Sequence, residues 1–266
     1  MTIFTMPAPV RKASIATKRN EVNMDETVMG MVLSVSPMGE YDKRVVILTK
    51  ECGKISAFAR GARKPNSPLL ACTQPFTFGE FSLYRGRNSF TIKSAKVINY
   101  FTELREEVED VYMGLYFCEF ASYFTKENLD AAEILKLLYQ SLRALKVPSL
   151  NRELVRYIFE LKLMTVNGEA PRVFSCIQCG SKEKLHGFLS QEAGIVCEDC
   201  MSLTKERVIT VRETTAYTMQ FIIGASIEKL YTFTVSKEVQ EELGRALRQY
   251  LKDHVGVSFH SLELID

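Results

Sequence analysis

Five short runs rich in β-branched and aromatic residues occupy the first part of the chain, and segments containing Gly or Pro separate them. Runs of this kind predict β-strands, and the Gly and Pro residues between them predict turns. One connection, residues 62–75, is longer than the others. The pattern predicts a small closed β-barrel of the OB type, with an SH3-like barrel as the nearest alternative. The expected strands are Val28–Ser36, Arg44–Thr49, Lys54–Gly61, Phe76–Tyr84 and Ser89–Ile98.

Near Tyr100 the pattern changes, and apolar residues begin to recur at intervals of three and four. This spacing places them on one face of a helix, so it predicts amphipathic helices. Two further helices, near Thr214–Ile223 and Lys237–His254, are expected to complete the same bundle. The clearest apolar stripes are Met113-Phe117-Phe120-Phe124, Ile134-Leu135-Leu138-Leu142-Leu145 and Leu154-Ile158-Leu161.

Charge is distributed unevenly along this chain of 266 residues, although the formal net charge is only +2. Residues 27–101 contain 11 Lys and Arg against 4 Asp and Glu, and the remainder of the chain is net acidic. A strongly basic barrel beside an acidic helical region favours a module that binds a polyanion, nucleic acid in particular. The alternative is that the positive charge only protects exposed strand edges from aggregation.

Strand alternation indicates which side chains of the barrel face outward. In Lys54–Gly61, the small apolar residues Ile55, Ala57 and Ala59 fall on one face, and Phe58 falls on the other. Basic side chains can track phosphates, and outward aromatic rings can stack on bases. Tyr84 and Phe90 are further stacking candidates, and Lys93 and Lys96 are expected on opposite faces of the last strand. The residues expected to bind nucleic acid are Lys43, Arg44, Phe58, Arg60, Arg63, Lys64, Arg85, Arg87 and Lys93.

Four of the seven cysteines form a C-x2-C-x17-C-x2-C pattern: Cys176, Cys179, Cys197 and Cys200. Two residues between thiols allow a tight turn to present both sulfur atoms to one ion, and the Gly-containing segment between the pairs can form a hairpin. The spacing predicts one structural Zn²⁺, because four thiolates complete a tetrahedral shell and leave no position for water or substrate. Glu198 and Asp199 are therefore expected to point into solvent.

Together these patterns predict an α+β multidomain protein: an N-terminal OB-type five-stranded β-barrel, followed by an all-α domain that carries a four-cysteine zinc ribbon as an insertion. The N-terminal arm is polar and lacks the apolar core of a secretory signal, so it is expected to be flexible. The expected segments are the arm at 1–24, the barrel at 25–101, the helical domain at 102–170 and 206–266, and the ribbon at 171–205.

No pattern in the chain indicates catalysis. The other thiols, Cys52, Cys72 and Cys118, have no ligand spacing, and the three His residues are scattered. The sequence contains no phosphate-binding Gly-rich motif in a strand-to-helix context and no apolar run of membrane-spanning length. We therefore expect neither an enzyme nor a membrane protein, and no small-molecule substrate.

A basic barrel, a helical domain and a C-x2-C…C-x2-C insertion in this order resemble the RecO family of bacterial recombination mediators. The resemblance is carried by Val32–Ser36, by the segment Ile55–Arg63 (ISAFARGAR) with Lys64 and Pro65, and by the ribbon from Phe174 to Cys200. It covers about residues 24–255. The cysteines vary within that family, so the ribbon supports the resemblance without defining it.

The resemblance implies a non-enzymatic DNA repair protein located in the cytoplasm at the nucleoid. Such proteins bind single- and double-stranded DNA and anneal complementary strands coated with single-strand-binding protein. Together with RecR they promote loading of RecA. The implied partners are thus DNA, RecR, single-strand-binding protein and, indirectly, RecA.

Two other classes of function remain open at this stage. The same barrel and ribbon would suit an RNA- or ribosome-associated binding protein, which a preference for RNA over single-stranded DNA would favour. An enzyme with a site in the helical domain would require an apolar pocket lined by convergent charged groups.

Overall fold

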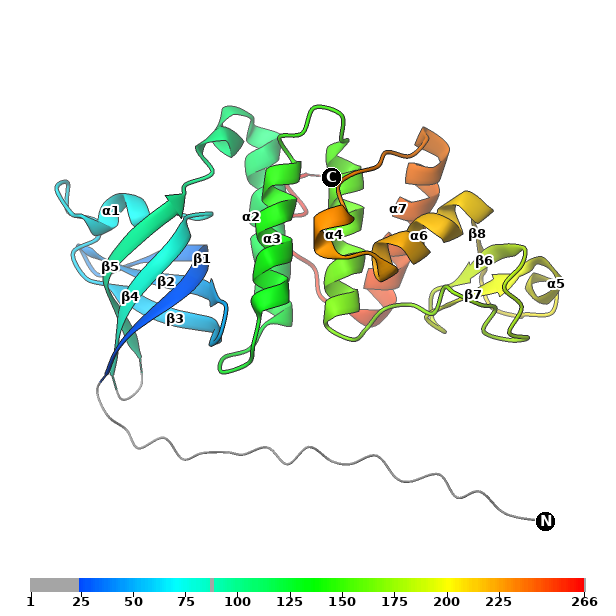
Figure 1. Ribbon diagram of the computed structural model, residues 1–266, viewed down its shortest axis with the longest axis horizontal. Helices are drawn as coiled ribbons and strands as arrows, with labels where there is room; N and C mark the ends of the chain where they lie inside the picture. The colour runs from blue at the N-terminus through cyan, green and yellow to red at the C-terminus, as the bar shows by residue number, and fades with distance from the viewer. Residues whose placement is uncertain (1–23, 87–88, 266) are drawn as a thin grey trace, which may run out of the picture.

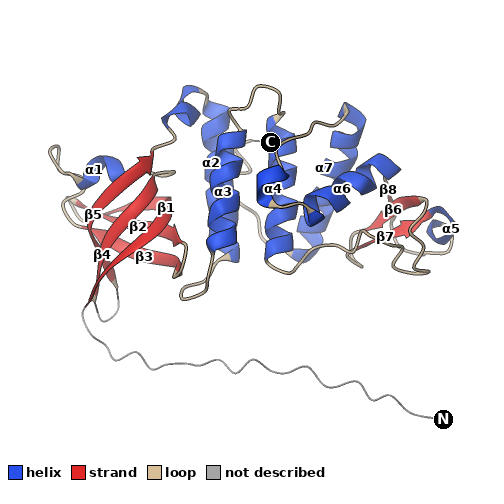
Figure 2. Ribbon diagram, in the orientation of Figure 1, coloured by secondary structure: helices blue, strands red, loops and turns tan. Residues whose placement is uncertain are grey.

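The computed structural model describes residues 24–86 and 89–265 and has three parts in a row, a β-barrel, a helical region and a small second sheet (Figure 1). Strands gather at the two ends of the molecule and helices fill the middle (Figure 2). Apart from Met24, the expected N-terminal arm lies outside the described residues, as does Arg87. None of the helices in the described ranges combines the length and the apolar character needed to cross a bilayer.

The first five strands close into a barrel with the order β1-β2-β3-β5-β4. All neighbours are antiparallel except β3 and β5, which pair in parallel through Ala57 with Phe90 and Phe58 with Thr91. A short helix, α1 (Leu69–Cys72), lies within the long connection between β3 and β4. This arrangement confirms the five-stranded OB-type barrel. The strands are β1 Met24–Met38, β2 Asp42–Thr49, β3 Gly53–Ala59, β4 Phe78–Arg85 and β5 Phe90–Asn99.

The barrel buries two different apolar surfaces. Its interior holds side chains such as Val32, Ile47 and Phe81, which form a cluster separate from the rest of the molecule. Met31 and Leu48 face outward and belong instead to the large cluster that includes the helices. Strand alternation produces this division, because successive side chains point to opposite sides of the sheet. The helical region is therefore attached to the barrel by apolar packing.

Backbone contacts reinforce this junction at Gly53, the first residue of β3. Gly53 forms an isolated antiparallel bridge with Glu127, and the Lys54 N–H donates to the Lys126 carbonyl (3.2 Å). The Lys54 ammonium donates to the Ser122 carbonyl (2.5 Å). Gly53 has φ +66°, and a Cβ there would collide with the carbonyl of Lys126. The close approach and the positive φ both require glycine at this position.

In the described ranges, five longer helices form the middle of the molecule, as expected, and one 3₁₀ turn lies between β5 and α2 and another between α6 and α7. Asn151 caps α4 by accepting a hydrogen bond from the Glu153 N–H (2.8 Å). The helices are α2 Val108–Phe124, α3 Ala132–Ala144, α4 Arg152–Val166, α6 Glu213–Gly224 and α7 Lys237–His254, and the 3₁₀ turns are Thr102–Glu106 and Ile227–Lys229.

Helix α4 is buried on all sides, whereas its apolar stripe predicts burial of one face. Every side chain from Leu154 to Met164 is buried, because helices pack on both flanks of α4. Polar groups on it are therefore paired: Arg156 donates to Glu160 (2.8 Å), and Glu160 also accepts from the Tyr116 hydroxyl (2.6 Å). Paired burial of this kind avoids the cost of an isolated charge in the core.

The second sheet consists of β6 (Leu185–Leu189), β7 (Gly194–Cys197) and β8 (Ile209–Thr210), in the order β7-β6-β8. β6 and β7 form the hairpin expected between the two cysteine pairs, and a single-turn helix, α5 (Glu198–Met201), follows. The apolar residues of this unit belong to the same cluster as those of the helices. The unit therefore has no separate apolar interior.

Candidate nucleic-acid interface and metal centre

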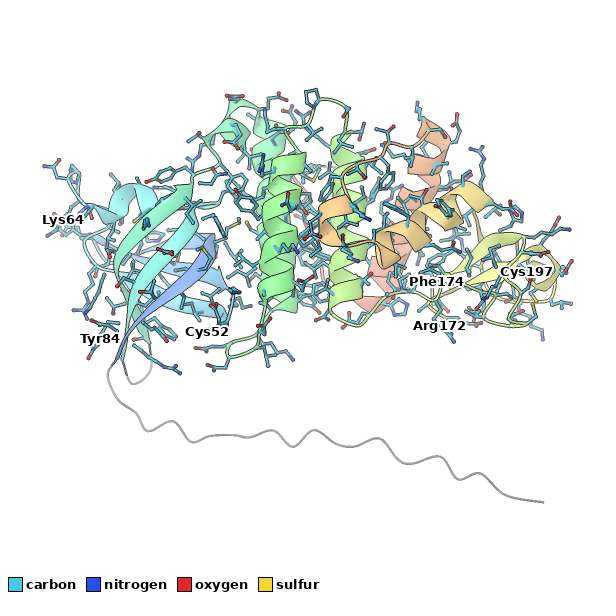
Figure 3. All side chains as sticks on the ribbon, viewed as in Figure 1. Cys52, Lys64, Tyr84, Arg172, Phe174 and Cys197 are labelled. Atoms are coloured by element: carbon cyan, nitrogen blue, oxygen red, sulfur yellow. The ribbon has the colours of Figure 1, made fainter. Side chains whose placement is uncertain are left out.

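The four cysteines of the C-x2-C pairs converge at the end of the molecule farthest from the barrel. Their sulfur atoms all lie within 4.8 Å of one another, and the Cys179 and Cys197 sulfurs are 3.6 Å apart. Cys176, Cys197 and Cys200 are buried, and Cys179 is exposed. Figure 3 shows Cys197 at this end and Lys64 and Tyr84 on the barrel at the other.

Two tight turns of the backbone present these thiols. In the first, the Gly180 N–H donates to the Cys176 carbonyl (2.9 Å), and Gly180 has φ +79°, which glycine adopts without strain. In the second, Cys197 precedes α5 and Cys200 lies within it. Glu198 and Asp199 between them are exposed, as predicted from a complete four-sulfur shell.

The donor set fits a tetrahedral metal ion. A metal–sulfur distance of about 2.3 Å gives sulfur–sulfur edges of about 3.8 Å in a tetrahedron, close to the 3.6 Å between the Cys179 and Cys197 sulfurs. Burial alone would raise the pKa of the Cys176 thiol. Hydrogen bonds from the backbone of Cys179, Cys197 and Gln178 outweigh this effect and lower the pKa to about 6. Burial and the neighbouring thiols raise the pKa of Cys200. Four ionised thiols at these distances would repel one another, and a bound cation removes that repulsion.

On the barrel, strand register places one row of outward side chains around the wall. Arg44 pairs with Phe58, Phe58 with Thr91, Thr91 with Tyr84, and Tyr84 with Asp25. Phe58 and Tyr84 are half-buried on the outer surface, and the Arg44 Nε donates to the hydroxyl of Ser56 beside Phe58 (2.8 Å). We call this row the aromatic row. It combines the Arg44 guanidinium on β2 with two rings, Phe58 on β3 and Tyr84 on β4, and β5 lies between the two ring-bearing strands.

The loop after β3 carries Arg60, Arg63 and Lys64, all of which are exposed. Tyr41, in the turn between β1 and β2, lies against this loop and is 45% exposed. Sequence reasoning missed Tyr41, because a single aromatic residue in a turn produces no periodic signal. The three basic residues and Tyr41 form a second surface, the basic loop, at the end of the barrel where Lys64 projects (Figure 3).

Two residues named from the sequence lie inside the protein. Lys43 is 8% exposed, and its ammonium donates to the hydroxyl of Thr73 (3.1 Å), beside α1. Lys43 is two residues before the inward-facing Val45 and therefore lies on the same side of the strand. Its side chain points under α1 and is not an open surface cation. Phe90 is also wrong as a stacking candidate, because it is 5% exposed and lies in the barrel interior.

The expectation that Lys93 and Lys96 lie on opposite faces of β5 is also wrong. The pairing of β4 with β5 shifts at this point, which leaves Lys93 as an extra residue in the strand. A bulge of this kind breaks the alternation, and both lysines are exposed. Lys93 is ion-paired with Asp25 (2.6 Å), while Arg85 stacks on the Phe90 ring (5.4 Å) at the barrel end.

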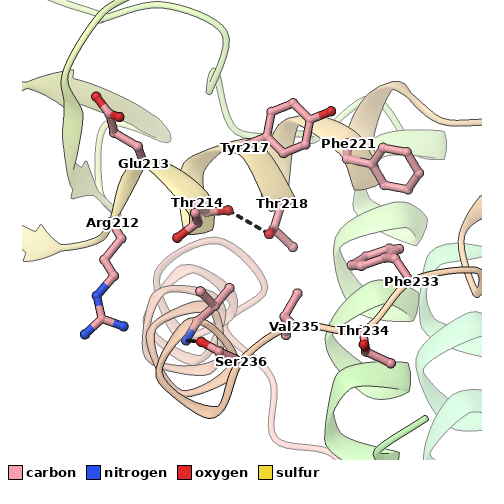
Figure 4. A pocket seen from close by; sticks show the side chains of 11 residues that line it. Arg212, Glu213, Thr214, Tyr217, Thr218, Phe221, Phe233, Thr234, Val235 and Ser236 are labelled. Carbon is pink, nitrogen blue, oxygen red and sulfur yellow. Dashed lines mark hydrogen bonds between the residues drawn. The ribbon is translucent and has the colours of Figure 1, made fainter. Parts of the chain in front are cut away.

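A groove of about 740 Å³ lies in the helical region between α6 and the segment that leads into α7 (Figure 4). The charged groups at its rim are engaged with other parts of the fold. Arg212 pairs with Glu238 and Glu242 (4.0 and 3.5 Å), and Glu213 lies 3.8 Å from His186. Among the described residues that line it, charged groups thus do not converge in the groove as an enzyme site would require. Its apolar lining comes from Tyr217, Phe221, Phe233, Val235 and Val239.

Comparison with known proteins relates this architecture to a family. Residues 24–101 match the profile described as "Recombination protein O N terminal", and residues 105–263 match "Recombination protein O C terminal". The chain is similar to "DNA repair protein RecO" from Alkaliphilus metalliredigens, with 33% identity over 241 residues, which cover 88% of this chain and 96% of the relative.

The protein of the same name from Acetivibrio thermocellus is 31% identical over 238 residues, covering 89% of this chain and 94% of the relative. The one from Bacillus subtilis is 27% identical over 237 residues, covering 89% and 92%. The matched profiles cover both the barrel and the helical region with its ribbon. The chain therefore belongs to the RecO family of DNA repair and recombination proteins.

Proposed function

We propose that the chain is a non-enzymatic recombination mediator that binds single- and double-stranded DNA through its barrel and anneals complementary strands. With RecR it promotes loading of RecA on DNA covered by single-strand-binding protein, in the cytoplasm at the nucleoid. Membership of the RecO family supports the DNA repair role. The observation that carries the proposal is the basic loop beside the aromatic row on an OB-type barrel.

The chemistry of these two surfaces suits a flexible, single-stranded polyanion. Arg60, Arg63 and Lys64 supply exposed cations for phosphates, and these contacts release condensed counterions. Phe58 and Tyr84 supply ring faces on neighbouring parts of the wall, and stacking on such faces is tolerant of sequence. Binding of this kind needs no catalytic group. It also leaves Watson–Crick edges free to pair with a second strand.

We propose further that the four-cysteine cluster holds one Zn²⁺ with a structural role. Zinc accepts four thiolates in a tetrahedral shell without a geometric preference of its own. Bound there, it supplies cohesion to a unit whose apolar residues are all shared with the helices. Cys176, Cys179, Cys197 and Cys200 would be its ligands.

The DNA proposal is tested by measuring affinity for a single-stranded oligonucleotide against salt concentration. The double variant Arg63→Ala/Lys64→Ala should bind all sequences more weakly, and the log–log slope should become shallower by about 1.4, or about 0.7 for each lost phosphate contact. The control is Lys205→Ala/Arg207→Ala, which removes the same two residue types from exposed positions in the ribbon. Equal affinity and slope for the barrel variant and the wild type would contradict DNA binding at the basic loop.

Annealing is measured with complementary strands precoated with single-strand-binding protein. The wild type should accelerate duplex formation, and the barrel variant should be slower than the ribbon control. Competition with RNA of the same sequence separates the proposal from an RNA-binding role. Preferential displacement of the DNA by RNA would favour the latter.

A further inference from the structure

Tyr41 is an exposed residue on a turn whose backbone is hydrogen-bonded to the loop after β3. The Arg63 N–H donates to the Tyr41 carbonyl (2.9 Å), and the Arg63 guanidinium donates to the Gly39 carbonyl (3.1 Å). On the next residue, Asp42 accepts a hydrogen bond from the Gly61 N–H (2.7 Å). These bonds join the β1–β2 turn to the basic loop. The backbone that carries the ring is therefore held in place before any ligand binds, which lowers the entropy cost of stacking on the ring.

One face of the ring already attracts a cation. The Lys64 ammonium lies 5.4 Å from the centroid of Tyr41, within the range of a cation–π contact. A hydrogen bond to Glu40 raises the pKa of the Tyr41 hydroxyl. An exposed cation–π contact is weak, so a base can compete for the ring while Lys64 moves to the adjacent phosphate.

We propose that Tyr41 stacks on an unpaired base and gives the barrel a preference for single-stranded over duplex DNA. The inference rests on the proposed DNA-binding function and adds a determinant of selectivity to it. Both forms of DNA present phosphates to Arg63 and Lys64. Bases in a duplex are stacked on one another and offer no free face, so only a single strand gains the contact with Tyr41.

The other outward rings also offer stacking faces, but they are more enclosed or lie beside a lysine that is already paired. Tyr84 also has a lysine above it, Lys93 at 5.6 Å, but Asp25 already neutralises that lysine. Phe58 lies within the barrel wall beside Arg44 and is half-buried. Tyr41 is exposed, its backbone is held by hydrogen bonds, and two cations, Arg63 and Lys64, lie beside it.

The test compares Tyr41→Ala and Tyr41→Phe in full-length protein, with an oligo(dT) strand and a duplex of equal length. Tyr41→Ala should weaken single-strand binding by about 10-fold with an unchanged salt slope, because stacking does not depend on counterions. Its duplex affinity should be unchanged, and Tyr41→Phe should behave like the wild type. The matched control is Tyr217→Ala, which removes an exposed tyrosine (67%) from α6.

A strand substituted with 5-bromodeoxyuridine should photocrosslink to Tyr41 and not to Tyr217. Unchanged single-strand affinity in Tyr41→Ala, or equal weakening for both DNA forms, would overturn the inference. Loss of binding in Arg63→Ala/Lys64→Ala alone would then leave the proposed function intact. If neither variant changed affinity, the proposed DNA-binding surface would itself be wrong.

Discussion

The barrel and the ribbon are both small β units at opposite ends of the helical region, yet different forces hold them together. The barrel closes its hydrogen-bond ladder and has an apolar cluster of its own, formed by residues such as Ile55, Phe81 and Leu83. In the ribbon, Phe188 and Ile195 belong to the helical cluster. Four converging thiols take the place of a separate interior.

This difference indicates which kind of substitution should destabilise each unit. The barrel has an apolar interior of its own, so charged and aromatic side chains on its outer wall are not needed to hold it together. With the proposed zinc bound, the ribbon would depend on one cation and its four ligands, and its exterior would be secondary to them. A perturbation of one unit should consequently leave the other intact. Two experiments test this separation, and two more test the barrel surface.

The largest effect is expected from loss of the metal. Cys176→Ser should abolish stoichiometric metal binding and unfold the ribbon locally, because structural zinc contributes about 10–16 kcal/mol in isolated zinc fingers. Metal analysis and hydrogen exchange would show loss of metal and of protection in β6 and β7, with β1–β5 unchanged. Cys52→Ser, outside the cluster, is the control. Full metal content in Cys176→Ser would contradict the assignment.

A cavity in the barrel is the opposite perturbation. Phe81 is fully buried in the barrel interior, so Phe81→Ala should lower the free energy of unfolding by about 3–5 kcal/mol. Hydrogen exchange should accelerate in β1–β5, while the rate of metal release to a chelator stays at the wild-type value. Faster metal release would show that the two units are coupled.

Truncating one outward and one inward phenylalanine of the barrel wall distinguishes effects on DNA binding from effects on stability. Phe58 points outward, so Phe58→Ala should cost about 1–3 kcal/mol in single-strand binding at every salt concentration, with little change in Tm. Phe90 points inward, so Phe90→Ala should lower Tm. Binding titrations and thermal unfolding of the pair measure both effects. A lower Tm with unchanged affinity in Phe58→Ala would make Phe58 part of the packing alone.

The smallest effect concerns the ion pair of Lys93 with Asp25. Both partners are exposed, so Asp25→Asn should change stability by less than about 1 kcal/mol. It should release Lys93 for a phosphate and steepen the salt slope of single-strand binding by about 0.7. The same titration used for the basic loop measures this. An unchanged slope would indicate that Lys93 does not face the DNA.

Strand and helix positions were accessible from the sequence because local periodicity determines them. Ile55, Ala57 and Ala59 are buried as alternation predicts, and the spacing of the cysteines anticipated their convergence. Because side chains two residues apart lie on the same face of a strand, the inward position of Val45 also predicts that Lys43 faces inward.

Other features depend on contacts between distant segments and leave no local pattern. The bulge at Lys93 appears only in the pairing of β4 with β5. The placement of Tyr41 depends on bonds to Arg63, more than twenty residues away in sequence. The burial of all sides of α4 depends on packing by helices that lie both before and after it in the chain.

The contact at Gly53 has a mechanical consequence. Since a β3 residue touches the loop after α2 too closely for any side chain, the barrel cannot rotate against the helices without breaking the Lys54 bonds. The helical region then keeps the barrel and the ribbon at a fixed separation. A fluorophore on the basic loop and another on the ribbon should report one separation, with or without DNA. Any assembly that engages both ends would meet them at a spacing set in advance by the protein.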